Sequence, residues 1–386
     1  RVRNCLEMRI ILTVKNFDFG GAENHVRELA NALAGRGHHV WVAAPPGRQA
    51  ALLHPAVQHV QVRYSDVLHP LQGLWLANLV RRERIDIIHA HQRLATLTSL
   101  IAGRVAARPV VATLHGQLQH DLTSWPGAAR MLARLIVVSP FFEDLVARHN
   151  PALAPRTVCI PNGVRRVEWN ATRDPGRQIV VYASRIVPRM EPFLASLASA
   201  AAVVARNYPA FELHICGDGP SLASLESYAE SANLAAGRNA VRLQGYSADL
   251  PVALATASLA LGVGRVAIEA LMQGVPVIPL NRRYVGEPVS RQKLGALAAM
   301  NFVPQHSPAP TRELLSATLC DALGRLDHLS AEAQGMQPLV AREHDIDVIA
   351  DRLEDVYGEV ALAPMPKRSR AFATATASAS TSLSSL

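Results

Sequence analysis

Two arginines and a glycine pair stand directly after segments that are expected to form strands. Arg185 follows the apolar run Gln178–Ala183, and Arg189 lies four residues further on. A guanidinium at the carboxyl end of a parallel strand can clamp a diphosphate, and a solvated surface arginine is the other interpretation. Gly20 and Gly21 separate the first expected strand from the first helix. Glycine at these positions lets the backbone approach an anion at the helix N-terminus. A simple strand-to-helix turn with no ligand would also favour glycine.

A carboxylate stands one turn into an otherwise apolar helical segment in the second half of the chain. This residue, Glu269, follows a glycine-rich turn that contains Gly262, Gly264 and Arg265. Burying an unpaired carboxylate is costly, so Glu269 must be paired or must bind a ligand. Carboxylates in nucleotide-binding folds commonly hold a ribose diol, which favours ligand contact over a structural role for Glu269.

Three histidines end two neighbouring strands of the first half. His115 follows the run Pro109–Leu114, and side chains at such strand ends face the crevice above a parallel sheet. It could hydrogen-bond a hydroxyl-rich substrate or stabilise developing charge, or it could be a structural histidine. Alternation places His89 and His91 on one face, where a metal pair is conceivable. No carboxylate or cysteine accompanies them in the sequence, so no metal site is predicted.

The elements that must position these residues alternate between strands and helices. This alternation runs from Met8 to about Val360 and predicts parallel, doubly wound sheets. A polar stretch rich in Asn, Gly and Pro interrupts it at Pro161–Arg177. The sequence therefore predicts an α/β protein of two tandem Rossmann-like domains, with a deep cleft between them as the default ligand site. The predicted strands are Arg9–Val14, His39–Ala44, Ile85–Ala90, Pro109–Leu114 and Leu135–Val138 in the first domain, and Gln178–Ala183, Phe211–Cys216, Val241–Gln244, Ser258–Leu261 and Val275–Leu280 in the second.

On this interpretation the chain divides into six segments. The tail is dominated by Ala, Ser and Thr, which bury too little apolar surface to fold, so we expect it to be disordered. The predicted segments are an N-terminal extension 1–7, a first domain 8–164, a linker 165–177, a second domain 178–340, a C-terminal helix 341–360 and the tail 363–386.

Composition narrows the class of protein. Of 386 residues, 49% are hydrophobic and 18% are charged, which excludes wholesale disorder. No apolar stretch reaches the roughly 18 residues that a membrane-spanning helix needs. The four cysteines lie far apart, which gives neither a zinc knuckle nor a disulfide framework, and together with the lack of a signal-peptide pattern predicts a cytoplasmic protein. The net charge of +8 is compatible with anionic ligands or an anionic membrane, and no nucleic-acid partner is predicted.

Several short segments occur in the order that is typical of one enzyme family. Each segment is weak evidence alone, but together they make the chain resemble the GT-B glycosyltransferases, and within them the large retaining family 4, from about Met8 to Tyr357. The matching segments are Gly20–Glu23, Asp86–His91, Thr113–Gly116, Ile160–Val164, Ser184–Pro188, Gly217–Pro220 and Glu269–Ile278.

The resemblance implies a nucleotide-sugar donor bound mainly by the second domain, an acceptor bound mainly by the first, and a C-terminal helix that crosses back to the first. It implies that the equivalent of Glu269 holds the ribose, that Arg185 attends the diphosphate and that His115 contacts the donor sugar. The predicted catalytic residues are His115 and Arg185, and the predicted donor-binding residues are Gly20, Gly21, Asn162, Arg185, Arg189, Gly262, Gly264, Arg265 and Glu269.

The implied reaction is hexosyl transfer, with retention of the anomeric configuration, to a glycan or lipid-linked acceptor in cell-surface polysaccharide or glycolipid biosynthesis. The sequence offers no identifiable nucleophile, which fits a front-face mechanism in which the leaving diphosphate helps to take the acceptor proton. Arginines would stabilise the developing charge, so neither a metal nor a cofactor is expected. The segment Asp345–Ile346–Asp347 resembles a metal-binding DxD motif but lies in the C-terminal helical region, and is discounted.

Two positions depart from the family pattern. Leu261 stands where the family has a glutamate, and Met190 stands where it usually has a lysine. Either the chain is a divergent active enzyme, which we favour, or it is a catalytically weakened nucleotide-sugar-binding protein. A sugar-nucleotide 2-epimerase of the same architecture is a further alternative, for which Asp121 is the nearest candidate acid. The lack of a GxGxxG fingerprint disfavours a nicotinamide enzyme.

One segment of the first domain has the composition of an amphipathic basic helix. It could contact an anionic membrane from the cytoplasmic side, or simply pack on the sheet, which we favour. Its apolar residues are Trp75, Leu76, Leu79 and Val80, and its arginines are Arg81, Arg82 and Arg84.

Overall fold

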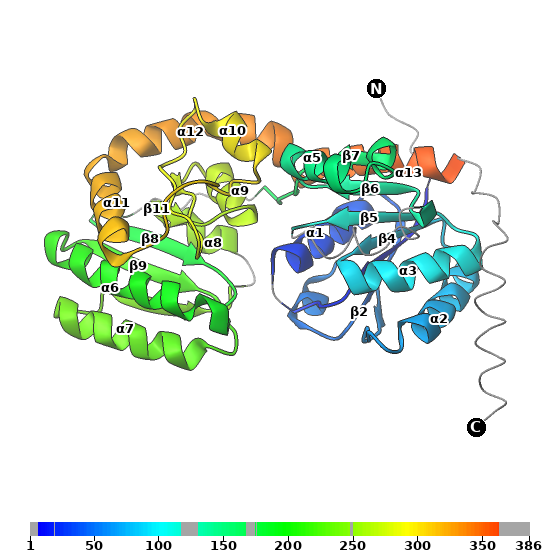
Figure 1. Ribbon diagram of the computed structural model, residues 1–386, viewed down its shortest axis with the longest axis horizontal. Coiled ribbons are helices and arrows are strands. Elements are labelled where there is room, and N and C mark those ends of the chain that lie inside the picture. Colours follow the sequence, from blue (N-terminus) through cyan, green and yellow to red (C-terminus); the bar gives the residue numbers. More distant parts are fainter. Residues whose placement is uncertain are drawn as a thin grey trace.

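The computed structural model describes residues 7–18, 20–116, 130–166, 174, 176–247 and 250–362. Figure 1 shows two α/β lobes side by side, connected along one edge by helices α12 (Leu326–His344) and α13 (Ile346–Leu362). The predicted architecture of two tandem Rossmann-like domains is confirmed. The predicted tail 363–386, and most of the predicted extension 1–7 and linker 165–177, lie outside the described residues, as does Asp121.

Seven parallel strands form the sheet of the first domain, in the order β3-β2-β1-β4-β5-β6-β7. The order reverses between β1 and β4, which is the point at which open α/β sheets bind ligands. The sequence missed the two edge strands, β3 and β7, because they are short and lack an apolar run. The strands are β1 (Arg9–Val14), β2 (His39–Ala44), β3 (Gln58–Gln61), β4 (Ile87–His91), β5 (Val110–Leu114), β6 (Arg134–Val137) and β7 (Thr157–Cys159).

Alternate residues of β1 supply the two cores of the first domain. Ile10 and Leu12 pack with α1 on one face of the sheet, whereas Ile11 packs with α2 on the other. Because both faces are covered, β1 is an almost continuous apolar run rather than an alternating one. The described helices of this domain are α1 (Gly21–Gly35), α2 (His69–Arg82), α3 (Arg93–Ala106) and α5 (Pro140–His149), with 3-10 turns at Arg48–Leu52 and Ala154–Arg156.

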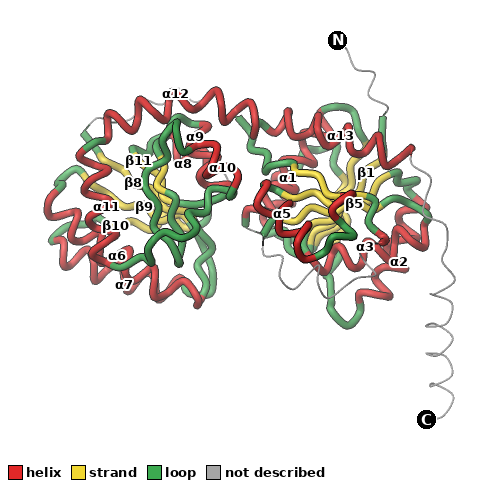
Figure 2. The backbone as a smooth tube through the Cα atoms, turned by 45° about the horizontal axis from the view of Figure 1, so that its top comes forward, coloured by secondary structure: helices red, strands yellow, loops and turns green. Residues whose placement is uncertain are grey.

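The second domain contains a five-stranded parallel sheet in the order β10-β9-β8-β11-β12, and each of its strands was predicted. Figure 2 shows the strands of both sheets enclosed by helices. The strands are β8 (Gln178–Ala183), β9 (Phe211–Cys216), β10 (Val241–Gly245), β11 (Leu259–Leu261) and β12 (Val277–Ile278). The helices are α6 (Glu191–Asn207), α7 (Leu222–Ala236), α8 (Leu250–Ala255), α9 (Arg265–Met272), α10 (Leu294–Ala299) and α11 (Arg312–Gly324), with a 3-10 turn at Pro188–Met190.

The two C-terminal helices belong to different domains. Met336 and Val340 of α12 lie in the core of the second domain, whereas Ile349 and Tyr357 of α13 lie in the core of the first. The break between them is at Asp345, whose backbone is extended. The last helix therefore completes the first domain after the chain has built the second.

The segment Asp345–Ile346–Asp347, which resembles a DxD motif, lies at the break between α12 and α13 and has a structural role there. The Asp345 carboxylate accepts a hydrogen bond from the backbone N–H of Asp347, at the start of α13. Asp347 in turn forms an ion pair with Arg36, which follows α1. These carboxylates are used to begin a helix and to attach it to the first domain.

The predicted amphipathic helix is α2, and its apolar residues divide between core and surface. Leu76, Leu79 and Val80 are buried in the core on one side of the sheet, which confirms for them the favoured interpretation that this helix packs on the sheet. Trp75 is 44% exposed. None of the described helices combines the length and apolar character that are needed to span a membrane.

Candidate functional site

The loops at the carboxyl ends of the two sheets meet each other across the domain junction. Arg185 follows β8, and its Nη2 lies 3.2 Å from Oε1 of Glu23, in the first turn of α1. Gly20 is the residue before α1, with φ of 148°. A Cβ on Gly20 would lie 2.6 Å from Nη2 of Arg185, so the close approach of the guanidinium requires glycine there.

A buried group of three charged side chains joins the domains at the same place. Arg265 begins α9, and its Nη2 lies 2.5 Å from Oε2 of Glu28 on α1. Its Nε lies 2.6 Å from Oε1 of Glu269, one turn further along α9. Its Nη1 donates a 2.8 Å hydrogen bond to the Gly163 carbonyl at the end of the first domain. We call Glu28, Arg265 and Glu269 the junction triad.

The two carboxylates of the junction triad have different protonation equilibria. Burial raises the pKa of Glu269 to about 7, because desolvation outweighs the attraction of Arg265. Burial opposes the charged form of Glu28, but its pKa is lowered because Arg265 attracts it and donates a hydrogen bond to it, with smaller contributions from Arg27 and from the Arg165 backbone N–H. Glu28 is therefore the fixed charge of the triad, and Glu269 is the group that can titrate near neutral pH.

Two further contacts lie at the rim of the junction. Arg48 of the first domain forms a 2.9 Å ion pair with Asp218, which follows β9. Gln49 donates a 2.6 Å hydrogen bond to the hydroxyl of Tyr246, which follows β10. These polar contacts place the loops after β9 and β10 against the first domain.

His115 lies at the end of β5, beside the junction. Its Nδ1 lies 3.2 Å from Oδ1 of Asn162, and the Asn162 carbonyl in turn is 3.1 Å from Nδ1 of His344 at the end of α12. Burial lowers the pKa of His115 to about 4, so the ring is neutral at neutral pH. It can therefore accept or donate a hydrogen bond there, but it is not a source of positive charge.

The structure brings most of the predicted site residues together, and it leaves some apart. Gly20, Gly21, Arg185, Arg265 and Glu269 meet at the junction, with Asn162 and His115 beside them. Gly262 and Gly264 form the turn before α9, where Gly264 has φ of 56°. Arg189 is exposed in the turn Pro188–Met190, and no contact among the described residues joins it to the others. Whether these residues bind a donor remains a prediction.

The two departures from the family pattern lie in the core of the second domain. Leu261 is 1% exposed and packs with the apolar residues of β8 and β9. Met190 packs against the same cluster. Each side chain therefore contributes to folding, which explains why apolar residues stand at these positions.

The sequence missed three residues of α1 that reach the junction. Glu23 contacts Arg185, Glu28 belongs to the junction triad, and His25 lies near His115 with 5.1 Å between the ring centroids. All three are buried. The sequence does show that α1 has polar residues besides the apolar residues that pack on the sheet. This pattern indicates a polar face of the helix, but it does not indicate which residues that face contacts.

A cavity of about 230 Å³ opens beside His115 in the first domain. Its lining is polar at Gln92, Arg93, Thr96 and Thr113 and apolar toward β6. Such a lining suits a ligand with hydroxyl groups at one end.

The fold is that of the GT-B class, as comparison with solved structures demonstrates. A glycosyltransferase from Rickettsia africae superimposes with a TM-score of 0.71 at 15% identity, covering 93% of this chain and 100% of that one. An Anabaena protein, Alr3699/HepE, solved in complex with UDP and glucose, superimposes with a TM-score of 0.70 at 19% identity, covering 91% and 100%.

Sequence comparison gives the family. The profile of Glycosyltransferase Family 4 matches residues 19–166, and that of Glycosyl transferases group 1 matches residues 165–315. A phosphatidyl-myo-inositol mannosyltransferase of Mycobacterium tuberculosis is 26% identical over 375 residues, which cover 89% of this chain and 94% of that protein. The chain belongs to the family 4, group 1 glycosyltransferases of the GT-B fold, and the predicted enzyme class is confirmed.

Proposed function

We propose that this glycosyltransferase moves a hexosyl group from a nucleotide-sugar donor to a lipid-linked or glycan acceptor, with retention of the anomeric configuration, in cell-surface glycolipid or polysaccharide biosynthesis. The observation that carries the proposal is the meeting of Arg185 and Gly20 where the carboxyl ends of the two sheets face each other. The mannosyl transfer named for the mycobacterial relative, and the UDP and glucose in the Anabaena structure, support the donor class.

Arg185 is the cation proposed for the donor diphosphate. Its side chain is 43% exposed and holds Glu23 through one nitrogen at 3.2 Å. A diphosphate carries more charge than a single carboxylate and forms bidentate hydrogen bonds with a guanidinium, so it can take over Arg185 from Glu23. The Glu23 carboxylate now lies against Gly20 beside the same guanidinium, and phosphate oxygens would take its place there. In the reaction, the bond between the anomeric carbon and the phosphate oxygen breaks, a bond to the acceptor oxygen forms on the same face, and the acceptor proton passes to the leaving diphosphate.

His115 and Glu269 are proposed to hold the sugar and the ribose. His115 is neutral, which suits hydrogen bonding to a sugar hydroxyl rather than proton donation. For Glu269 to accept ribose hydroxyls, Arg265 must give up its 2.6 Å contact with Glu269 while it keeps Glu28. No step of this scheme needs a metal ion, because Arg185 supplies the positive charge.

The acceptor side is proposed to include an exposed apolar surface of the first domain. Leu71, Leu74 and Trp75 are exposed on one face of α2, and Val67 and Leu68 are exposed just before it. We call these five residues the α2 patch. The exposed arginines Arg81, Arg82 and Arg84 follow the patch. A contiguous apolar surface beside arginines fits the interface of an anionic membrane, where a lipid-linked acceptor would lie.

A nucleotide screen tests the donor proposal. We expect one of UDP, GDP, ADP or CMP to raise the melting temperature of the protein, since a ligand at a hundred times its Kd stabilises by about 2.7 kcal/mol. The Arg185→Ala variant should lose this stabilisation, and Arg206→Ala, which changes an exposed arginine of α6, should keep it. Stabilisation that persists in Arg185→Ala would show that the nucleotide binds elsewhere.

Transfer and membrane binding need their own assays. With the matching nucleotide sugar, we expect labelled hexose to enter phosphatidylinositol-containing vesicles, and NMR of the product to show the donor's anomeric configuration; an inverted product would refute retention. The Leu71→Ser, Trp75→Ser double variant should bind anionic vesicles roughly 30-fold more weakly, from about 1 kcal/mol for each half-exposed side chain. Leu234→Ser removes an equally apolar exposed residue of α7 and should bind as the wild type does.

A further inference from the structure

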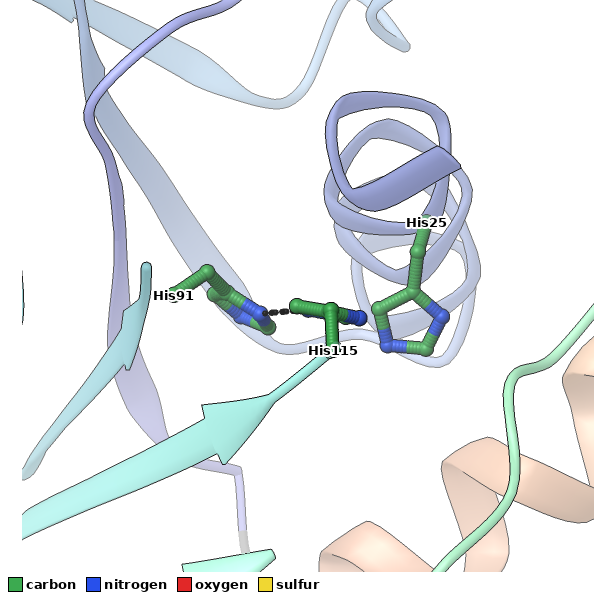
Figure 3. A group of neighbouring side chains, drawn as sticks. All are labelled: His25, His91 and His115. Carbon is green, nitrogen blue, oxygen red and sulfur yellow. Dashed lines mark hydrogen bonds between the residues drawn. The ribbon is translucent and has the colours of Figure 1, made fainter. Parts of the chain in front are cut away.

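Three histidines from three elements of the first domain converge beside the junction. His25 comes from the start of α1, His91 ends β4 and His115 follows β5. One ring nitrogen of each lies within 4.8 Å of the others. Figure 3 shows His115 between the other two rings. The sequence disfavours a metal site at His89 and His91. The fold instead brings His25 and His115, which are distant in the chain, next to His91.

Hydrogen bonds on the outer side of this histidine cluster direct lone pairs to its inner side. Nδ1 of His115 faces Oδ1 of Asn162, which can only accept, so Nδ1 carries the hydrogen and Nε2 keeps its lone pair. The backbone of Gly163 accepts a hydrogen bond from His25, whose Nδ1 is buried without a partner. Histidines that bind metals usually donate their other ring N–H to such an acceptor, which fixes the orientation of the ring.

His91 supplies the third nitrogen. Its Nδ1 lies 2.9 Å from Nε2 of His115 and donates the hydrogen of that contact, since Nε2 of His115 has only a lone pair. Its own Nε2 is buried without a partner. If the hydrogen moves to Nε2, then Nδ1 presents a lone pair toward the same point as His115. Unpartnered buried polar atoms are rare and costly, and a cation bound between the rings would give Nδ1 of His25 the partner that it lacks.

The charge of the cluster suits a cation ligand set. Burial holds the pKa of His25 and His91 well below its usual range and that of His115 at about 4, so all three rings are in the neutral form that binds metals. The positive charge of Arg265 acts on both His25 and His115. Its repulsion is offset by Glu28, whose carboxylate is in contact with it.

We propose that His25, His91 and His115 bind a transition-metal cation of the Zn²⁺ class, with a fourth position open to water or an anionic ligand. Three imidazoles with one open position form a common zinc ligand set. Imidazole also suits Co²⁺, Ni²⁺ and Cu²⁺, whereas Mg²⁺ and Ca²⁺ prefer oxygen ligands. The site goes beyond the transferase proposal and does not depend on it. The two meet only at His115, because its Nε2 cannot hold a metal and a sugar hydroxyl at once.

Metal binding is measured directly on the full chain. After dialysis against EDTA, we expect Co²⁺ to bind with one equivalent and to give the visible absorption of a low-symmetry site, and Zn²⁺ to displace it. Zn²⁺ should also raise the melting temperature. His25→Gln and His91→Gln should each abolish the cobalt spectrum, and Asn162→Ala should weaken binding by about 10- to 100-fold, as is typical when the hydrogen-bond partner of a ligand is removed. His149→Gln, a change of an exposed histidine on α5, is the matched control and should leave binding unchanged.

The outcomes separate this site from the other histidines of the chain, which has 15 in all. Binding that persists in folded His25→Gln and His91→Gln, judged by circular dichroism, would assign the metal to surface histidines and overturn the proposal. Failure of the wild type to bind one equivalent of Co²⁺ or Zn²⁺ would overturn it as well. Neither result bears on nucleotide binding at Arg185, which is measured with the nucleotide alone.

Discussion

The junction triad allows a quantitative test of how the two domains are held together. In the Arg265→Met variant, the apolar side chain is of similar length, but Glu28 and Glu269 lose the guanidinium between them. Both carboxylates are buried, with 7% and 2% of their side chains exposed. Removing one partner from a buried ion pair typically costs about 3–5 kcal/mol, because a buried charge is left without compensation.

The structure places Arg265→Met at the lower end of that range. Glu28 keeps Arg27, whose Nη2 lies 2.9 Å from its Oε1, and also keeps a backbone hydrogen bond. Glu269 already has a pKa of about 7 and can take a proton once Arg265 is gone. We therefore expect a loss of about 3 kcal/mol at pH 7. That corresponds to a melting temperature lower by roughly 6–12 °C for domains of this size.

Urea and thermal denaturation of matched variants provide the assay. Arg325→Met removes an arginine that pairs with Asp321 on an exposed face, and it should change stability by less than about 1 kcal/mol. Arg265→Met should also recover part of its loss at pH 5, where Glu269 is protonated. If Arg265→Met is no more destabilised than Arg325→Met, the triad does not hold the domains together and the reasoning from burial is refuted.

Three further variants test other parts of the structure. Glu269 has a folded-state pKa raised to about 7, so its contribution to stability falls as pH rises from about 4.5 to 7; Glu269→Gln should remove this slope, and an unchanged urea-unfolding profile across that range would contradict the shift. Tyr357→Phe leaves Nδ1 of His89, now 2.6 Å from the hydroxyl, without a partner, and should lower the free energy of unfolding by about 1–3 kcal/mol; a loss within error of zero would argue against that hydrogen bond. Gly219→Ala should lower the melting temperature, because Gly219 has φ of 153° and a new Cβ would lie 2.1 Å from a backbone oxygen; a wild-type melting curve would mean that the loop relaxes freely.

The fold was predictable because each domain repeats one simple pattern. The strands β1 and β8 are mostly buried and appear in the sequence as nearly continuous apolar runs, whereas β4 is equally buried but ends in the sequence His89–Ala90–His91. Glycine-containing turns follow β1, β9 and β11, and they predicted which ends of the strands would face a ligand. The edge strands β3 and β7 escaped prediction, because an edge strand needs few apolar residues and takes its hydrogen bonds from one side only.

The candidate site was predictable only in part. Arg185 follows a predicted strand and Glu269 stands in an otherwise apolar helix, so their types and positions were sufficient to select them. Glu23, which pairs with Arg185, and Glu28, which pairs with Arg265, come from α1, more than a hundred residues away, and only the approach of the two domains brings these pairs together. A carboxylate on an amphipathic helix is usually solvated, so nothing in the local sequence distinguishes these two.

Leu261 stands where the family pattern has a glutamate, but the junction triad still contains two buried carboxylates. Glu28 supplies a second carboxylate from the first domain, 2.5 Å from the guanidinium that also contacts Glu269. In the proposed mode of donor binding, in which Glu269 holds the ribose, Arg265 would keep Glu28 and the Gly163 carbonyl, so no buried charge would be left without a partner. Donor binding would then exchange one contact of Arg265 rather than break the junction, which is why we regard Leu261 as compatible with an active enzyme.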